Sequence, residues 1–187
     1  GSRKGMNSKL KKFVQKKYKN SKSDLYACFI EKCIAYCKDI KYTAMITQHS
    51  FMFTDEYKSL RKKILQNIVF VNMVHLGTDA FPEISGEKVQ TTTFVIKNIS
   101  NKLYKGRFVR LVDFKCSEKP KHIHKKDLSF AKYSNAEFTD IQGTPISYWI
   151  SQKIKDSFSI GRPFEYFGKP RAGITTGAND EFLRVWH

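Results

Sequence analysis

Apolar residues at helical spacing open the chain and predict two helices. The first is short and amphipathic, begins at Asn7 or Ser8, and places on one face Leu10, Phe13, Val14 and Tyr18. Ser23 or Asp24 predicts the start of a second helix that runs to about Lys38. Because this second segment is apolar nearly all round, we expect it to be well buried.

Short apolar runs that follow predict three strands, namely Tyr42 to Thr47, Ile68 to His75 and Thr91 to Ile96. The first two lack polar alternation, which is typical of buried strands. Between them, Thr54 is the expected N-cap of a helix that ends at Asn67, with acidic residues early and basic residues late. This order of helices and strands is typical of one half of an α/β layer.

The pattern changes in the second half of the chain. Arg107 to Phe114 predicts an edge strand, a lysine-rich loop follows, and Phe138 to Ile141 predicts a short strand. Gly143 to Phe158 predicts a helix with Thr144 as its N-cap and a proline at its first position. Glycines and prolines between Gly161 and Gly177 predict a loop.

These patterns divide the chain into three expected segments. Residues 1–23 form a basic helical segment, residues 24–98 an α/β unit, and residues 99–187 a mixed α+β extension. A buried strand needs neighbours on both edges, and a sheet covered by helices normally has more strands than this. We therefore expect the front of the α/β domain to be missing from this chain.

Composition and charge narrow the function classes. Of 187 residues, 41% are hydrophobic, so the chain contains enough apolar material to fold. The formal net charge of +17 predicts a polyanionic partner, with nucleic acid as the first candidate. No apolar run approaches the roughly 18 residues of a membrane span, and no signal peptide is visible. We expect a soluble, cytoplasmic chain without membrane contact.

Positive charge is concentrated at the N-terminus. Residues 1–23 contain nine bases and no acid: Arg3, Lys4, Lys9, Lys11, Lys12, Lys16, Lys17, Lys19 and Lys22. Such a segment suits contact with a phosphate backbone, although an ordinary solvated face is about as consistent with the sequence.

Other candidate chemistry is weak. His122 and His124 lack cysteine or carboxylate partners at ligand spacing, so no metal site is expected. His49 and Ser50 are adjacent, and adjacent side chains on an extended segment point in opposite directions, which argues against a hydrolase pair. No CxxC pair is present, and we expect reduced structural thiols at all four cysteines, Cys28, Cys33, Cys37 and Cys116.

Six strings together resemble one enzyme family. They are SDLYACFIE from Ser23, MITQHSFM from Met45, HLG from His75, VQT from Val89, GTPISYWIS from Gly143 and GITTG from Gly173. The chain resembles the second half of class I N6-adenine DNA methyltransferases, especially those of Eco57I-like restriction-modification systems and PglX-like (BREX) phage-exclusion systems. The resemblance implies a partial Rossmann-like sheet, S-adenosylmethionine as the cofactor of the parent enzyme, and double-stranded DNA as its partner.

Two motifs of that family do not occur in this sequence. One is the glycine-rich loop that binds S-adenosylmethionine, and the other is the Asn-Pro-Pro-Tyr type motif that holds the target amino group. The resemblance places the second motif just before Gly1, although Gly1 and Ser2 are equally consistent with a cloning scar. It therefore implies no catalytic residue in this chain, no cofactor bound to it, and no activity of the chain alone.

The resemblance also suggests which residues contact DNA. Adenine must be flipped out of the duplex and held by an aromatic face. Residues leaving the end of a strand at Gln48 can provide the pocket floor. Phe51 is the wall candidate, with core packing as its alternative, and Gln48 and Ser50 are polar contacts. Phe81 is a rim candidate, although a loop aromatic folded back on the sheet is favoured there. For the DNA backbone the candidates are Arg3, Lys4, Lys9, Lys11, Lys12, Lys16 and Lys17.

Two other functions stay open at this point. The chain could be a nucleic-acid-binding or partner-binding module without enzymatic activity that keeps a methyltransferase-like half-fold. It could also be part of an RNA-directed methyltransferase. A half-fold exposes sheet edges, which makes a homodimer possible.

Overall fold

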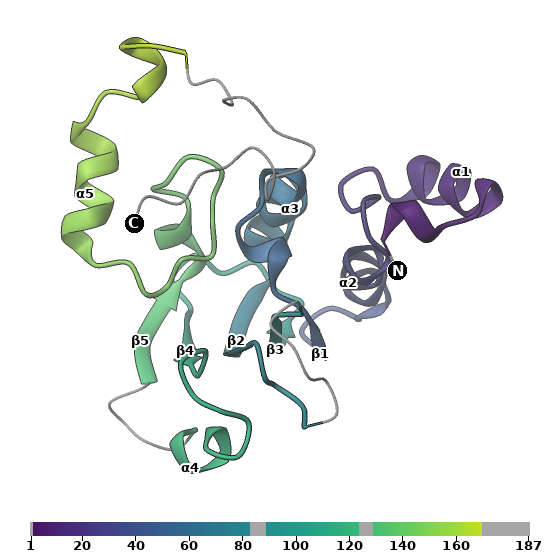
Figure 1. Ribbon diagram of the computed structural model, residues 1–187, viewed down its shortest axis with the longest axis horizontal. Coiled ribbons are helices and arrows are strands. Elements are labelled where there is room, and N and C mark those ends of the chain that lie inside the picture. The colour runs from purple at the N-terminus through teal and green to yellow at the C-terminus, as the bar shows by residue number, and fades with distance from the viewer. Residues whose placement is uncertain (1, 83–88, 124–128, 170–187) are drawn as a thin grey trace, which may run out of the picture.

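The computed structural model describes residues 2–82, 89–123 and 129–169. Figure 1 shows its helices and strands in chain order: α1 (Ser8–Lys17), α2 (Leu25–Tyr36), β1 (Tyr42–Gln48), α3 (Lys58–Asn67), β2 (Val69–Gly77), β3 (Thr91–Lys97), β4 (Lys105–Arg110), α4 (Lys119–His122), β5 (Ser129–Ser134) and α5 (Gln152–Ile160). Short 3-10 turns lie at Arg3–Gly5, Ser50–Met52, Asp55–Tyr57, Asn135–Phe138 and Phe164–Tyr166. The fold is a mixed α/β structure.

The five strands form one mixed sheet in the order β1-β3-β2-β4-β5. Strands β1 and β2 both pair antiparallel to β3, so they run parallel to each other with β3 between them. Strand β4 pairs parallel to β2, and β5 pairs antiparallel to β4. The sheet therefore continues without a break across the expected boundary at residue 98.

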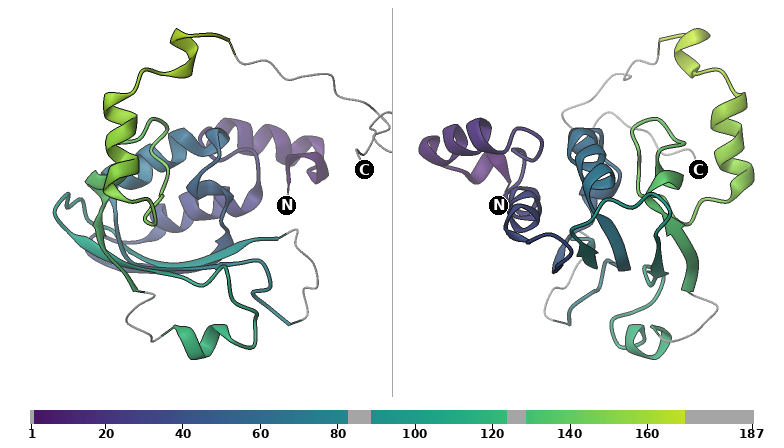
Figure 2. Two further views of the ribbon diagram at one scale, coloured as in Figure 1. Left: turned by 60° about the vertical axis from the view of Figure 1, so that its left-hand side comes forward. Right: turned by 180° about the vertical axis from the view of Figure 1, so that it is seen from behind.

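Most helices lie on one face of the sheet. In the left view of Figure 2, α2, α3 and α5 are on the concave side and α4 is on the other side. Between α3 and the sheet, the ring of Phe94 packs edge-on against Phe51 (5.6 Å) and Phe70 (6.0 Å). A second small core of Met6, Val14 and Cys28 attaches α1 to α2. Among the described residues, no helix is long and apolar enough to cross a membrane.

Local signals located the first three helices and gave the starts of the first two and the end of the third. Asn7 accepts a hydrogen bond from the backbone nitrogen of Leu10, and Asp24 accepts one from Tyr26, as expected of N-caps. Helix α3 ends at Asn67 as predicted, but it begins only at Lys58, because a 3-10 turn follows Thr54. The Thr54 hydroxyl donates to the carbonyl of Ser50 instead of capping the helix.

Two predictions of deep burial were wrong. Helix α2 ends at Tyr36. It buries only Ala27, Cys28 and Ile30, because α1 and the sheet cover only part of its surface. Strand β1 lies at the sheet edge and pairs only with β3, so its residues alternate between exposed and half-buried positions along most of its length. An apolar run does not distinguish an edge strand from a central one.

Three predictions in the second half were also wrong. The strand predicted at the sheet edge is β4, and it lies inside the sheet between β2 and β5. The strand predicted at Phe138 to Ile141 is replaced by β5 and the turn Asn135–Phe138 that follows it. The helix predicted from Gly143 begins at Gln152, because the preceding segment packs along the loop after β1. The GITTG string from Gly173 lies outside the described residues.

Candidate functional site

Two histidines meet where β1 and β2 end. His49 follows β1 directly, and His75 lies near the end of β2. Nδ1 of His49 is 2.7 Å from Nε2 of His75, and Nδ1 of His75 is 3.2 Å from the hydroxyl of Tyr148. Because β1 and β2 are parallel, their carboxyl ends share one edge of the sheet, where open α/β sheets bind ligands.

The environment keeps both histidines neutral at physiological pH. Burial, followed by the nearby His49 and Arg110, lowers the pKa of His75 to about 4. Burial also lowers the pKa of His49. Two neutral imidazoles at this distance share one proton between the facing nitrogens. Burial raises the pKa of Tyr148, so its hydroxyl stays protonated and can serve as a donor.

Aromatic rings surround the histidine pair. Phe53 packs edge-on against His49 at 5.2 Å and against Trp149 at 5.3 Å. Trp149 also lies 6.0 Å from His75 and 5.0 Å from Tyr148. We call these five residues, His49, Phe53, His75, Tyr148 and Trp149, the aromatic cluster. Tyr148 is fully buried, whereas 37% of Trp149 is exposed, so the cluster reaches the surface through the indole.

Hydrogen bonds from Arg61 of α3 join the loop that carries Phe53 to the segment that carries Tyr148 and Trp149. Only 1% of this residue is exposed. Its guanidinium donates to the carbonyl groups of Phe51 and Thr54 after β1, and to those of Gly143 and Thr144 far along the chain, at 2.6 to 3.2 Å. The backbone nitrogen of Ile146 donates to the carbonyl of Met52 at 2.9 Å. These bonds hold the segment that bears Tyr148 and Trp149 beside the loop that bears Phe53.

Close packing and buried hydrogen bonds also fix the turn after β2. Gly77 has φ +71°, and a Cβ atom there would lie 2.8 Å from Val112, so no side chain fits without movement. The buried ammonium group of Lys119 donates to the carbonyls of Thr78, Asp79 and Phe114. Phe81 follows this turn and is half-buried.

The four residues predicted for the target-base pocket, Gln48, Ser50, Phe51 and Phe81, have different surroundings in the structure. Gln48 is exposed at the end of β1. Ser50 lies 2.6 Å, oxygen to oxygen, from the hydroxyl of Tyr26. Phe51 is fully buried against Phe94 in the core, which is the alternative stated for it. Among the described residues, the ring contacts of the aromatic cluster do not include Phe81. Phe53 is the ring of this loop that packs in the cluster.

The basic candidates gather at one end of the molecule. Helix α1 packs on α2 at the end away from α5, as Figure 1 shows. Arg3 and Lys4 are exposed just before it, and Lys9, Lys12, Lys16 and Lys17 are exposed on it, whereas Lys11 is half-buried. Arg3, whose backbone nitrogen donates to the carbonyl of Ser23, ties this segment to the start of α2.

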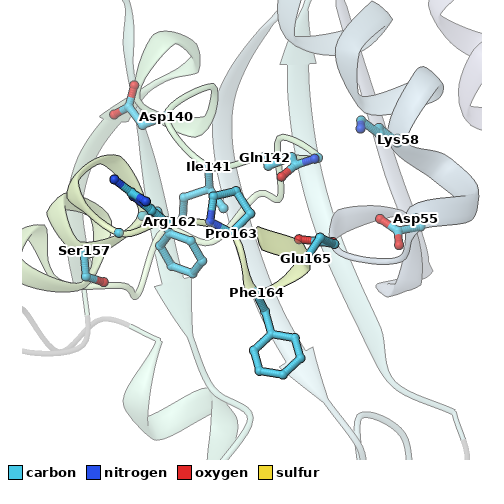
Figure 3. Close-up of a pocket in the computed structure, with 13 residues that line it drawn as sticks. Asp55, Lys58, Asp140, Ile141, Gln142, Ser157, Arg162, Pro163, Phe164 and Glu165 are labelled. Atoms are coloured by element: carbon cyan, nitrogen blue, oxygen red, sulfur yellow. The ribbon is translucent and has the colours of Figure 1, made fainter. Parts of the chain in front are cut away.

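A hollow elsewhere on the molecule has mixed charge. It measures about 740 Å³. Figure 3 shows Asp55 and Lys58 on one side and Arg162, Pro163 and Glu165 on the other. Acids and bases both line it, so its charge selects no ligand class. No group of three or more metal-ligating side chains occurs within the described part of the chain.

A cofactor cradle is not visible in the residues that are described. The left-handed glycine at the end of β2, Gly77, serves close packing, because a Cβ atom there would lie 2.8 Å from Val112. No described residue is therefore assigned to S-adenosylmethionine.

Sequence comparisons give the class of protein. Residues 1–81 match the protein family described as "Eco57I restriction-modification methylase". One solved structure, the M protein of the type I restriction enzyme EcoKI, is similar over 46% of this chain and 19% of its own, with a TM-score of 0.40 and 12% identity.

Two curated relatives give closer matches. Over 183 residues the chain is 38% identical to the adenine-specific methyltransferase BrxX of Escherichia coli O9:H4 (strain HS), which covers 98% of this chain. Over 186 residues it is 40% identical to the adenine-specific methyltransferase PglX of Lacticaseibacillus casei (strain Zhang), which covers 95% of it. The chain is thus a relative of the Eco57I-like and BrxX/PglX methyltransferases, as predicted from its sequence. It spans about 15% of the length of these two relatives.

Sequence reasoning missed four residues of the site, namely Arg61, His75, Tyr148 and Trp149. His75 had a usable signal, because it is one of two polar residues, with Asn72, in a mostly apolar strand. Trp149 lay in a segment predicted to be helical, which hid its position. Arg61 had no signal, since a basic residue late in a surface helix is ordinary.

Proposed function

We propose that this chain is part of a site-specific DNA adenine-N6 methyltransferase that uses S-adenosylmethionine and serves a restriction-modification or phage-defence system. In this proposal the chain contributes part of the target-base pocket and part of the DNA-facing surface, and it is inactive alone. The observation that carries the proposal is the aromatic cluster at the carboxyl ends of β1 and β2, in a chain 38–40% identical to adenine-specific methyltransferases.

The topology supports a Rossmann-like origin for the sheet. Strands β1 and β2 are parallel and are connected through α3, as in the crossover units of doubly wound folds. The outer edge of β1 has no strand partner among the described residues, so further parallel strands can join there. In the isolated chain, the same edge is the proposed contact for a homodimer.

The chemistry assigned to the chain is binding rather than methyl transfer. Gln48 and Ser50 supply polar contacts beside the flipped base, and Phe81 supplies part of the rim. The exposed bases of α1 neutralise phosphates, which gives affinity without sequence choice.

The test compares this chain with the longest open reading frame that contains it. Each is expressed in a host without other adenine methylation, and N6-methyladenine in host DNA is measured by mass spectrometry of nucleosides. We expect N6-methyladenine with the longer protein and none with the chain alone. Absence of N6-methyladenine with the longer protein contradicts the enzymatic function, and retained DNA binding would then favour the non-enzymatic module. Methylation by the chain alone contradicts its proposed inactivity.

A further inference from the structure

A basic hollow is lined by α3, by the loop after β3 and by the segment that follows β5. Its volume of about 550 Å³ is typical of small-molecule sites. Lys58 and Lys62 come from α3, and Lys102 comes from the loop. None of the described residues that line this hollow is acidic. We call it the lysine hollow, and its charge favours an anionic ligand.

The three lysines of the hollow are exposed, and no described residue forms an ion pair with them. Lys58 and Lys62 lie four residues apart on α3, so their side chains are neighbours on one face and their charges repel each other. A bound anion would relieve this repulsion and gain contact with both ammonium groups.

Hydrogen bonds join the walls of the lysine hollow to α3. The hydroxyl of Ser100, in the loop after β3, donates to the carbonyl of Gln66 at 2.9 Å. The buried side chain of Asn135, after β5, donates to the carbonyl of Leu65 at 3.1 Å. A ligand therefore meets walls that are in place before it binds, which lowers the entropic cost of binding.

The wall also contains a strained threonine with an unused hydroxyl. Thr144 has φ +51°, which is rare for a β-branched residue. Its carbonyl accepts a hydrogen bond from Nε of Arg61 at 3.2 Å, which holds this conformation. Its hydroxyl oxygen is buried and has no hydrogen-bond partner among the described residues. Both features cost free energy, and both are more frequent at functional sites than elsewhere in proteins.

The lining suits a ligand that has a flat organic part as well as phosphates. Leu65 and Ile141 are buried and provide an apolar floor. Exposed amide side chains, which both donate and accept hydrogen bonds as the edge of a nucleobase requires, belong to Gln66, Asn101 and Gln142. Lysine binds phosphate as a point charge. A free nucleotide fits into a concave site of this size, whereas a DNA duplex presents a convex surface.

The mixed-charge hollow of Figure 3 adjoins the lysine hollow, because Lys58 and Gln142 line both. Its acidic residues, Asp55 among them, line only the mixed-charge hollow. Phosphates are therefore best placed away from Asp55, towards Lys62 and Lys102.

We infer that the lysine hollow binds a free nucleoside polyphosphate, with its phosphates at Lys62 and Lys102 and its base over Leu65 and Ile141. None of the four residues predicted for the target-base pocket lines this hollow. The inference is independent of the proposed function, because it assigns another ligand to another part of the chain.

Isothermal titration calorimetry of the 187-residue chain tests the inference with ATP, adenosine and inorganic triphosphate at equal ionic strength. We expect ATP to bind at least about tenfold more tightly than adenosine, because its phosphates contact the lysines. It should bind at least about threefold more tightly than inorganic triphosphate, because its base is buried. Inorganic triphosphate carries at least as much charge as ATP, so general attraction to a basic chain does not favour ATP.

A matched pair of double variants locates the site. Lys62→Gln with Lys102→Gln should weaken ATP binding at least about tenfold, and Lys62→Arg with Lys102→Arg should retain most of the affinity. The control, Lys38→Gln with Lys153→Gln, removes the same charge at exposed lysines outside the hollow and should leave the affinity nearly unchanged.

Three results overturn the inference. One is that ATP binds no more tightly than inorganic triphosphate, and another is that the two glutamine double variants weaken ATP binding equally. The third uses a 12-nucleotide single strand of DNA as a further probe. If Lys62→Gln with Lys102→Gln weakens binding of this strand but not of ATP, the hollow is a contact for the DNA backbone.

Discussion

Arg61 is buried among carbonyl groups rather than carboxylates. Its guanidinium makes hydrogen bonds to four main-chain carbonyls, two from the loop after β1 and two from residues 143 and 144. Burial lowers its pKa, and the nearby Asp55 opposes that shift. The guanidinium therefore acts as a rigid set of hydrogen-bond donors. It satisfies main-chain carbonyl groups that have no hydrogen-bond partner in a strand or helix.

We expect Arg61→Met to destabilise the chain by about 3 kcal/mol, because buried carbonyls lose their donors, although removal of a buried charge offsets part of the cost. Urea denaturation gives the free energy of unfolding. The matched control is Lys62→Met at the exposed neighbouring position, which should change stability by less than about 0.5 kcal/mol. Similar losses for the two variants would contradict the role assigned to Arg61.

At the scale of elements, helix α1 has one apolar face that packs against α2 and one basic face that is exposed to water. Val14 and Leu10 pack toward α2, while most lysines of the helix face water. The helix has no acidic residue in its first turn and two lysines in its last. Its outer face therefore presents positive charge on an element fixed by the Met6, Val14 and Cys28 core.

We expect weaker binding to double-stranded DNA when four lysines of α1 are replaced by glutamate. They are Lys11, Lys12, Lys16 and Lys17. Each lost phosphate contact should also reduce the slope of log K against log salt by about 0.9. Fluorescence anisotropy at several salt concentrations measures both quantities. The control carries the same charge change at four exposed lysines elsewhere, Lys38, Lys102, Lys121 and Lys153. Equal weakening in both variants would mean that net charge, not α1, sets the affinity.

Elements whose signals are local were predictable, and those defined by long-range contacts were not. Asn7, Asp24 and Asn67 mark helix ends through bonds within a few residues. Whether a strand lies at an edge depends on partners elsewhere in the chain, which misled the interpretation of β1 and β4. The segment before α5 is extended because Arg61 and Met52 bind it, and neither residue is near it in sequence.

The candidate site shows the same division. Sequence predicted the carboxyl end of β1 as the place of the site, and the structure puts the aromatic cluster there. It did not predict the partners, because His75 and Trp149 approach His49 only through sheet pairing and the path of the chain after residue 143. Phe51 and Phe53 are two residues apart in one loop, and only packing decides which of them enters the core.

For the whole molecule, the histidine pair makes stability depend on pH. His75 has a pKa near 6.5 when unfolded and about 4 when folded, so between these values the unfolded state binds a proton that the folded state does not. Stability is therefore highest above pH 6.5 and falls as the pH drops toward 4. The groups that face His75 are His49, Arg110, Asp113 and Tyr148.

We expect this histidine to cost roughly 3 kcal/mol of stability between pH 6.5 and pH 4. Urea midpoints at pH 7, 5.5 and 4 measure the loss, and His75→Gln should flatten it because glutamine does not titrate. His122→Gln is the control, since this half-buried ring stacks on Phe114 rather than on His49 or His75. Parallel pH profiles for the wild type and His75→Gln would contradict the expectation.

The bonds from Arg61 to Gly143 also set an order of events during synthesis. They connect residues 82 positions apart, so the ribosome must add all of the intervening chain before the guanidinium can meet its second pair of carbonyls. Until that point a newly made chain carries β1, α3 and β2 with the loop after β1 held from one side only. The edge that bears His49 and Phe53 is therefore completed only after residue 143 has been added, and so after the strands on which it stands.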